Sequence, residues 1–128
     1  MLGLCDQVTG DWGEEVTRLC FALDLVDEAA SVAEYERWHT KGAVWPEVIA
    51  DIYAQGILDM EIWRTGNRLF MIVSAANDYP HPRQPHPKIA DWEDLMWTFQ
   101  QALPKAETSE KWVPMARIFA LADHKIAL

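Results

Sequence analysis

The segment Ile57–Ala75, which reads ILDMEIWRTGNRLFMIVSA, contains two strand-like runs on either side of a short turn sequence. The runs are Ile57–Arg64 and Arg68–Ala75, and Thr65-Gly66-Asn67 between them is typical of a β-hairpin. Within the first run, apolar residues alternate with mostly polar ones, so one strand face is expected to be wetter than the other. The segment therefore predicts an antiparallel pair of strands in the middle of the chain.

One strand and two helices are expected before this hairpin. The apolar run Thr17–Leu25 fits a first strand. Asp27 can cap a helix that runs to about Thr40. Pro46 is well placed at the first position of a second helix, and Gly56 is expected to end that helix in a left-handed conformation.

A proline-rich segment, a helix and a last strand are expected after the hairpin. Residues 77–88 carry four prolines, which exclude regular structure over that stretch. Apolar residues recur at helical spacing from Trp92 onwards, and Pro104 is expected to stop that helix. Trp112–Leu121 fits a last strand, and Pro114 places its beginning at an edge or a bulge.

The resulting order, β-α-(α)-β-β-α-β, predicts an α+β fold of the ferredoxin-like, split βαβ type, with helices on one face of a four-stranded sheet. The uncovered face would need a partner, so we expect a homodimer whose sheets pack face to face. A chain of 128 residues is too short for two sizeable cores. We expect a flexible extension at residues 1–15, one domain at 16–121 and a tail at 122–128.

Composition excludes several classes of function. A net charge of −9 argues against nucleic-acid binding, which depends on clustered Lys and Arg, and it can reflect no more than a solvated acidic surface. No window approaches the ~20 apolar residues of a membrane-spanning helix, and the first residues do not resemble a secretory signal, so a cytoplasmic location is expected. Cys5 and Cys20 are too few for a zinc ribbon or a disulfide framework.

Tyr35 and His39 form the first candidate site, because residues four apart lie on one side of a helix, together with Trp38. Histidine titrates near neutrality and tyrosine can donate or accept a hydrogen bond, so the pair could transfer protons. A helix that merely exposes two polar-tipped aromatic residues would show the same spacing. His81 and His86 lack a recognised metal-ligand pattern, so a metal site is not expected there.

Tryptophans and carboxylates supply further candidates. Trp92 lies on the apolar stripe of its helix, where a core role is the default. Trp38 and Trp63 lie at the edges of elements, where amphipathic aromatic residues often line a cleft. Three carboxylates could bind hydroxyl groups of a ligand, although each alone is more often a solvated charge: Asp59, Glu61 and Glu93.

The order and spacing of these motifs resemble the L-rhamnose mutarotase family. The matching pieces are Glu34–His39, then Trp45-Pro46-Glu47, then Gly56, followed by the hairpin and by Trp92-x-x-x-Met96. A final Phe-x-Leu at residues 119–121 extends the resemblance over roughly residues 16–121. Their combination is more specific than any single motif.

This resemblance implies a dimeric α+β barrel of ferredoxin-like subunits and a mutarotase without metal or cofactor. Such an enzyme interconverts the anomers of a 6-deoxy-hexose by acid/base opening of the sugar ring. His39 matches the proton donor of the family, and Tyr35 matches a substrate-binding position. Trp92 matches the first of two adjacent tryptophans that contact sugar. The base is not assigned, and Asp59, Glu61 or Glu93 could supply it.

The sequence departs from the rhamnose-type pattern around the sugar. Glu93 replaces the second tryptophan, Met60 replaces a sugar-contacting tyrosine, and the spacing from His39 to Trp-Pro-Glu is two residues longer. The segment Lys111–Met115 resembles a branch associated with L-fucose, which is therefore favoured over L-rhamnose. The alternative class is a non-catalytic small-ligand binder or a monooxygenase-like dimeric α+β barrel.

Overall fold

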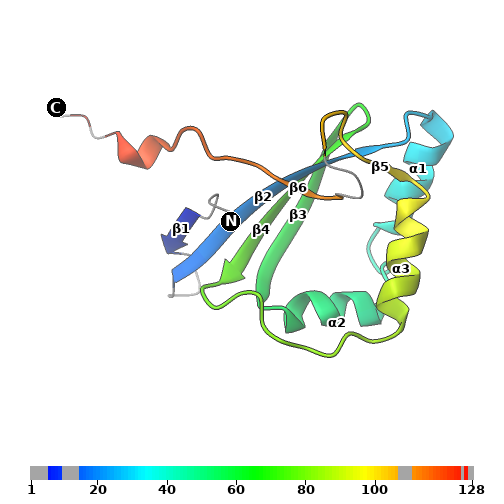
Figure 1. Ribbon diagram of the computed structural model, residues 1–128, viewed down its shortest axis with the longest axis horizontal. Helices are drawn as coiled ribbons and strands as arrows, with labels where there is room; N and C mark the ends of the chain where they lie inside the picture. The colour runs from blue at the N-terminus through cyan, green and yellow to red at the C-terminus, as the bar shows by residue number, and fades with distance from the viewer. Residues whose placement is uncertain (1–5, 10–14, 107–110, 125, 127–128) are drawn as a thin grey trace.

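The computed structural model describes residues 6–9, 15–106, 111–124 and 126, and it confirms the α+β class (Figure 1). A long antiparallel sheet carries three helices along one side. The strands and helices are, in chain order, β1 Asp6–Thr9, β2 Glu15–Leu25, α1 Ala29–Trp38, α2 Pro46–Ala54, β3 Ile57–Thr65, β4 Arg68–Ala76, α3 Lys88–Trp97, β5 Gln100–Gln101, β6 Val113–Pro114 and the 3₁₀ turn η1 Leu121–Asp123.

Strand β2 is the central element of the sheet. It pairs with β4 from Val16 to Asp24, and β4 pairs in turn with β3. The short strands β1, β6 and β5 also pair with β2, opposite Glu15–Arg18, Phe21–Ala22 and Asp24–Leu25. Because a strand has two hydrogen-bonding edges and β4 occupies one, these three segments share the other edge.

Local sequence signals correctly located the middle of the fold. The hairpin of β3 and β4 turns at Gly66-Asn67, and Gly66 has a positive φ of 57°. Helix α2 begins at Pro46, as predicted, and Gly56 follows its end with φ of 95°. The predicted first strand is confirmed as β2, which begins two residues earlier than expected.

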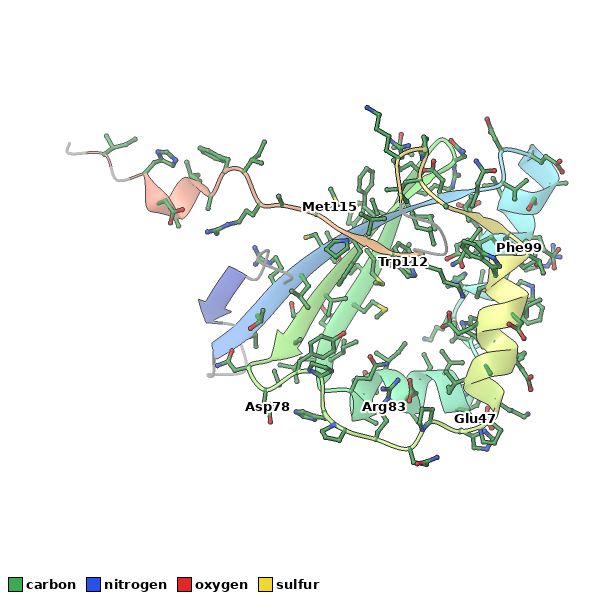
Figure 2. The ribbon with its side chains drawn as sticks, viewed as in Figure 1. Glu47, Asp78, Arg83, Phe99, Trp112 and Met115 are labelled. Atoms are coloured by element: carbon green, nitrogen blue, oxygen red, sulfur yellow. The ribbon has the colours of Figure 1, made fainter. Side chains whose placement is uncertain are left out.

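The predicted last strand is wrong beyond its first residues. Of the predicted strand 112–121, only Val113 and Pro114 pair with β2. The Met115 N–H then donates to the Cys20 carbonyl at 2.8 Å. The chain leaves the sheet after this point (Figure 2), and Ile118 is 95% exposed. The apolar residues at 118–121 therefore do not form a buried strand in the single chain.

Three other boundaries also differ from the sequence prediction. Helix α3 ends at Trp97 rather than near Pro104, because Gln100 and Gln101 leave the helix to pair with β2. The N-cap of α1 is Glu28 rather than Asp27, and it makes no side-chain cap bond. Within the predicted extension, residues 6–9 form β1, whereas residues 1–5 and 10–14 lie outside the described residues.

The core lies between the sheet and the helices, in two clusters of buried side chains. One cluster joins β2, β4 and all three helices, and its members are Leu25, Tyr35, Val48, Leu69, Trp92 and Met96. The other lies farther along the sheet and consists of Leu19, Ile57, Val73 and Ala75. Because side chains alternate along a strand, Cys20, Phe70 and Ile72 point to the opposite face, which no helix covers in Figure 1.

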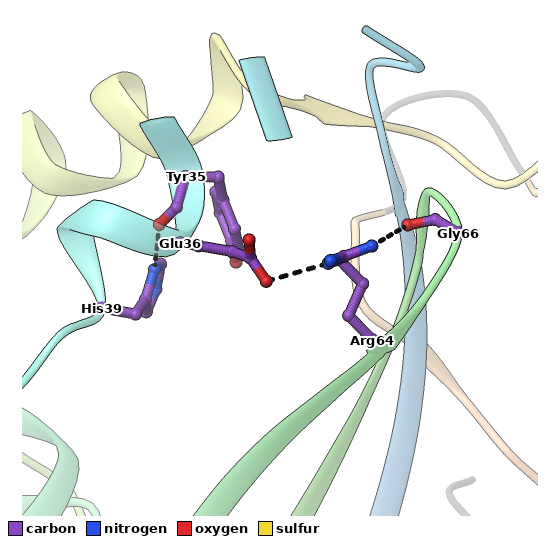
Figure 3. Close-up of polar contacts among 5 residues, drawn as sticks. All are labelled: Tyr35, Glu36, His39, Arg64 and Gly66. Atoms are coloured by element: carbon purple, nitrogen blue, oxygen red, sulfur yellow. Dashed lines mark hydrogen bonds and ion pairs between the residues drawn. The ribbon is translucent and has the colours of Figure 1, made fainter. Parts of the chain in front are cut away.

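Polar contacts hold the helices and the proline-rich segment in place. Arg64 of β3 donates to the Glu36 carboxylate of α1 at 3.0 Å and to the Gly66 carbonyl at 2.7 Å (Figure 3). Arg83 binds the Asp51 carboxylate of α2 through two hydrogen bonds of 2.9 and 3.0 Å. These contacts position α1 and the segment 77–88 relative to the sheet and to α2.

Gly56→Ala should destabilise the protein more than Gly42→Ala. Both glycines have positive φ, which costs an alanine ~1–2 kcal/mol. A Cβ at Gly56 would also lie 2.9 Å from the His81 ring, whereas nothing lies within 4 Å of one at Gly42. Urea unfolding should show a loss larger by about 1 kcal/mol or more at Gly56, as for overpacking. Equal losses would contradict the close packing of His81.

Candidate active site

A cavity of about 560 Å³ lies between the sheet and the three helices. Its volume falls in the usual range for small-molecule sites. The sheet contributes an apolar wall from Phe21, Met60, Met71 and Val73. Polar side chains also line the cavity, and most of them lie on the helices or at the helix ends: Tyr35, His39, Asp51, Gln55, Tyr79, Glu93 and Gln100.

Tyr35 and His39 meet at the end of α1, as their spacing predicted. His39 is the C-cap residue, and its Nδ1 lies 2.7 Å from the Tyr35 carbonyl oxygen (Figure 3). A carbonyl can only accept, so Nδ1 carries the hydrogen and Nε2 carries the lone pair in the neutral ring. The two rings lie 4.4 Å apart between centroids, and both line the cavity.

Burial sets the protonation of this pair. It lowers the pKa of His39 below its usual 6.5, against the opposing effect of the bond to the Tyr35 carbonyl. Burial raises the pKa of Tyr35 to about 12, and the Glu93 carboxylate adds to that increase, while a hydrogen bond from Gln100 opposes it. At neutral pH, His39 is therefore a hydrogen-bond acceptor at Nε2, and Tyr35 keeps its hydroxyl proton.

Trp92 of α3 is the centre of an aromatic cluster beside this pair. The His39 ring lies 5.9 Å from it, Trp45 lies 5.2 Å from it and Trp38 lies 6.1 Å from it, all in edge-to-face geometry. Trp92 is buried yet lines the cavity, whereas Trp38 is not among the lining residues. Trp38 therefore supports the wall that Trp92 forms, and it does not itself face the cavity.

Met60 and Glu93, at positions that the family resemblance associates with sugar contact, both line the cavity. Met60 belongs to the apolar wall of the sheet. Glu93 lies one residue beyond Trp92 and is half exposed, and its Oε2 accepts from Lys111 Nζ at 3.2 Å. Lys111 also lies over the Trp97 ring, 5.1 Å from its centroid.

Asp59 and Trp63 lie away from the cavity, on the opposite face of the sheet. The register of β3 changes between Ile57 and Asp59, and from there Met60 points to the helices while its neighbours point outward. Trp63 is 60% exposed and donates through Nε1 to Glu61 Oε1 at 3.0 Å. The structure thus groups Tyr35, His39, Trp92, Glu93 and Met60, and it separates Asp59, Glu61 and Trp63 from them.

The structure adds polar residues that the sequence interpretation missed. Gln100 of β5 donates through Nε2 to the Tyr35 hydroxyl at 3.3 Å. Gln55, the C-cap residue of α2, donates to the Asp51 carboxylate at 3.0 Å, and Arg83 holds the pKa of Asp51 below its usual value. Asp51 and Gln55 share a helix face through their spacing of four, but Gln100 belongs to no motif and carried no signal.

The two histidines of the proline-rich segment make hydrogen bonds within that segment. His81 Nε2 lies 2.7 Å from an Asp78 carboxylate oxygen, and the Lys88 N–H donates to His86 Nδ1 at 3.0 Å. Among the described residues, no three His, Cys, Asp or Glu side chains are grouped so that they could hold a metal ion. None of the helices in the described ranges is long and apolar enough to span a membrane.

The chain matches known proteins over most of its length. A family model described as L-rhamnose mutarotase matches residues 18–121. An L-fucose mutarotase of Xanthomonas campestris is 47% identical over 83% of this chain and 89% of its own length. A UPF0734 protein of Dictyostelium discoideum is 34% identical over 78% and 86%.

A solved structure shares the fold. The crystal structure of an L-rhamnose mutarotase from Formosa agariphila superposes with a TM-score of 0.59 at 22% identity, and the match covers 80% of this chain and 96% of the other. The sheet with three helices is thus also found in that enzyme. From the family match and the identities of its relatives, the chain belongs to the L-rhamnose mutarotase family of sugar mutarotases.

Proposed function

We propose that this protein is a cofactor-free mutarotase that interconverts the α and β anomers of a 6-deoxy-hexose, with L-fucose favoured over L-rhamnose. The observation that carries the proposal is the Tyr35–His39 pair at one cavity wall, with opposite hydrogen-bonding roles at neutral pH. The 47% identity to an L-fucose mutarotase supports the choice of sugar. A ligand binder or a monooxygenase-like barrel would not require this pair to face the cavity.

The pair suits acid/base opening of the sugar ring. His39 Nε2 accepts the proton of the anomeric hydroxyl while the carbonyl forms and the bond from the anomeric carbon to the ring oxygen breaks. The protonated imidazole then donates that proton to the ring oxygen. Rotation about the bond to the aldehyde carbon and the reverse steps close the ring to the other anomer. Positioned proton transfer typically contributes ~10²–10⁴-fold, which suits a reaction that already proceeds in water.

In this proposal, one histidine acts first as the base and then as the proton donor. The lowered pKa of His39 keeps the ring neutral at neutral pH, so that it can accept the proton first. The same lowered pKa makes the protonated ring a stronger acid, which suits the second role. Tyr35 stays neutral and holds a sugar hydroxyl by donating to its oxygen. Trp92 and Met60 contact the apolar side of the sugar, because both present carbon-rich surface to the cavity.

The pH dependence of anomer exchange tests the role of His39. Because the neutral ring is the active form, kcat/KM should be constant above pH 6.5 and fall about tenfold per unit below the lowered pKa. Saturation-transfer NMR on L-fucose, corrected for the uncatalysed rate, measures the profile. His39→Ala should remain folded and lose the acceleration. A rate that rises as the pH falls below 6.5 would show that the protonated ring is the starting form.

Glu93 is proposed to set the choice of sugar. Its carboxylate at the cavity accepts hydrogen bonds from one or two correctly placed hydroxyls, whereas the tryptophan it replaces would offer mainly a flat apolar surface. An epimer with a misplaced hydroxyl loses such a bond, and any partner group that the bound sugar buries is left unpaired at ~1–3 kcal/mol. Glu93 therefore favours one ring stereochemistry more strongly than an aromatic residue would.

The wild-type protein should prefer L-fucose over L-rhamnose at least about tenfold in kcat/KM, since ~1.4 kcal/mol is a factor of ten. Glu93→Gln should reduce this preference more than it lowers the rate on the poorer sugar. Asp94→Gln is a matched control, because Asp94 is exposed on the same helix and does not line the cavity. Equal rates on both sugars for the wild type would refute the role of Glu93.

We further propose that the chain is a ferredoxin-like subunit of a homodimeric α+β barrel. The sheet face opposite the helices carries Cys20, Phe70, Ile72 and Trp63, and no helix covers it (Figure 1). The segment after β6 leaves the sheet with exposed apolar side chains, including Ile118 and Phe119. A second copy of the chain would cover this face and these side chains.

Light scattering at micromolar concentration should give about twice the chain mass of 14.7 kDa. Trp63→Lys should shift the protein toward the monomer, because it puts a charge in the proposed interface. Tyr53→Lys is the control, because Tyr53 is similarly exposed on α2, on the helix side of the sheet. A monomeric, active wild-type protein would show that the sheet face needs no second chain.

A further inference from the structure

Gln100 occupies an unusual position at the cavity wall. It belongs to β5, where it pairs with Leu25 of β2, directly after the turn that ends α3. Cross-strand partners point to the same face, so its side chain lies on the helix side with Leu25 and Tyr35. Gln100 is only 8% exposed and lines the cavity, whereas the neighbouring Gln101 is exposed.

One end of the Gln100 amide has no hydrogen-bond partner. Nε2 donates to the Tyr35 hydroxyl at 3.3 Å, whereas Oε1 is buried and unpaired among the described residues. Turning the amide over would exchange the two atoms and leave the other end unpaired instead. Buried polar side chains are rarely left in this state, because an unpaired amide oxygen loses its bonds to water without replacement.

Tyr35 has the complementary deficiency. Its hydroxyl oxygen accepts from Gln100, and the described residues provide no acceptor for the hydroxyl hydrogen. An unused donor and an unused acceptor therefore lie next to each other at one wall of the cavity. A single hydroxyl group satisfies both, because it accepts from Tyr35 through its oxygen and donates its own hydrogen to Gln100.

We propose that Gln100 is a sugar-binding residue that, with Tyr35, holds one non-anomeric hydroxyl of the substrate from both sides. This inference rests on the proposed mutarotase function and assigns part of its specificity. A group that only accepts, such as a fluorine, cannot fill this position, and a hydrogen leaves both partners unpaired. Gln100 therefore selects sugars that carry a hydroxyl in one place and orientation.

Gln100→Met separates binding from stability, because methionine is similar in size and has no hydrogen-bonding group. Loss of a substrate hydrogen bond should raise KM for L-fucose about tenfold, with kcat changed less than about threefold. The thermal midpoint should stay close to the wild-type value, because removal of the unpaired amide oxygen offsets the loss of the long 3.3 Å bond to the Tyr35 hydroxyl. Gln101→Met, on the same strand and exposed, should match the wild type in both measurements.

Sugars that lack one hydroxyl identify the bonded group. For the wild type, one of the 2-, 3- and 4-deoxy forms of L-fucose should bind about tenfold more weakly than L-fucose itself, as measured by calorimetry. In Gln100→Met, the same form and L-fucose should bind within about twofold of each other. This coupling distinguishes a direct contact from a general disturbance of the cavity, which would weaken all the sugars alike.

The outcomes separate this inference from the function on which it rests. A wild-type protein that does not accelerate anomer exchange would refute the proposed function, whatever Gln100 does. Normal exchange in the wild type and unchanged KM in Gln100→Met would overturn only the role of Gln100. A lowered thermal midpoint with unchanged sugar binding would also overturn it, because Gln100 would then bind structural water or serve packing alone.

Discussion

The antiparallel pairing of β2 with β4 is the constraint on which the rest of the structure depends. Residues Val16–Asp24 pair with Arg68–Ala76, so the side chains of both strands alternate in step between two faces. The face toward the helices carries Leu19, Leu25, Leu69 and Val73, which are members of the two core clusters. Burial of such side chains contributes ~1.5–3 kcal/mol each. Because α1 and α3 pack against this face, the pairing also determines where Tyr35 and Trp92 lie.

The protonation of the site is a consequence of the same packing. Tyr35 is a member of the core cluster at the end of the sheet, so its hydroxyl is desolvated and keeps its proton. His39 is one helical turn farther along, where the last carbonyls of α1 lack helical partners, and its Nδ1 bonds one of them. The helix end therefore fixes the tautomer, and burial keeps the ring neutral. No charged partner is needed to make the two residues differ in their hydrogen-bonding roles.

The sequence predicted the elements whose signals are local. Gly66, Pro46 and Gly56 each mark a turn or a helix boundary through the backbone angles they allow, and the structure has those boundaries. The spacing of Tyr35 and His39 correctly placed them together. The end of α3 was wrong because it depends on Gln100 pairing with β2, a residue distant in sequence. The alternation along β3 already places Asp59 and Trp63 on the face opposite Met60, but only the structure shows which of the two faces lines the cavity.

Gln100 was not predicted as a site residue, because its place at the cavity wall depends on pairing between distant segments of the chain. A polar side chain at that place is nevertheless informative. A residue that contributes only to packing would be apolar at this place, between Leu25 and Tyr35 at a buried wall. An amide with one unpaired end costs stability there, and only a ligand or a water can return the missing bond. Tyr35 offers an unused hydroxyl hydrogen at the same wall, so a single ligand hydroxyl can bond both residues. The unpaired amide oxygen and the neighbouring tyrosine hydroxyl are therefore the observations on which the proposed role of Gln100 rests.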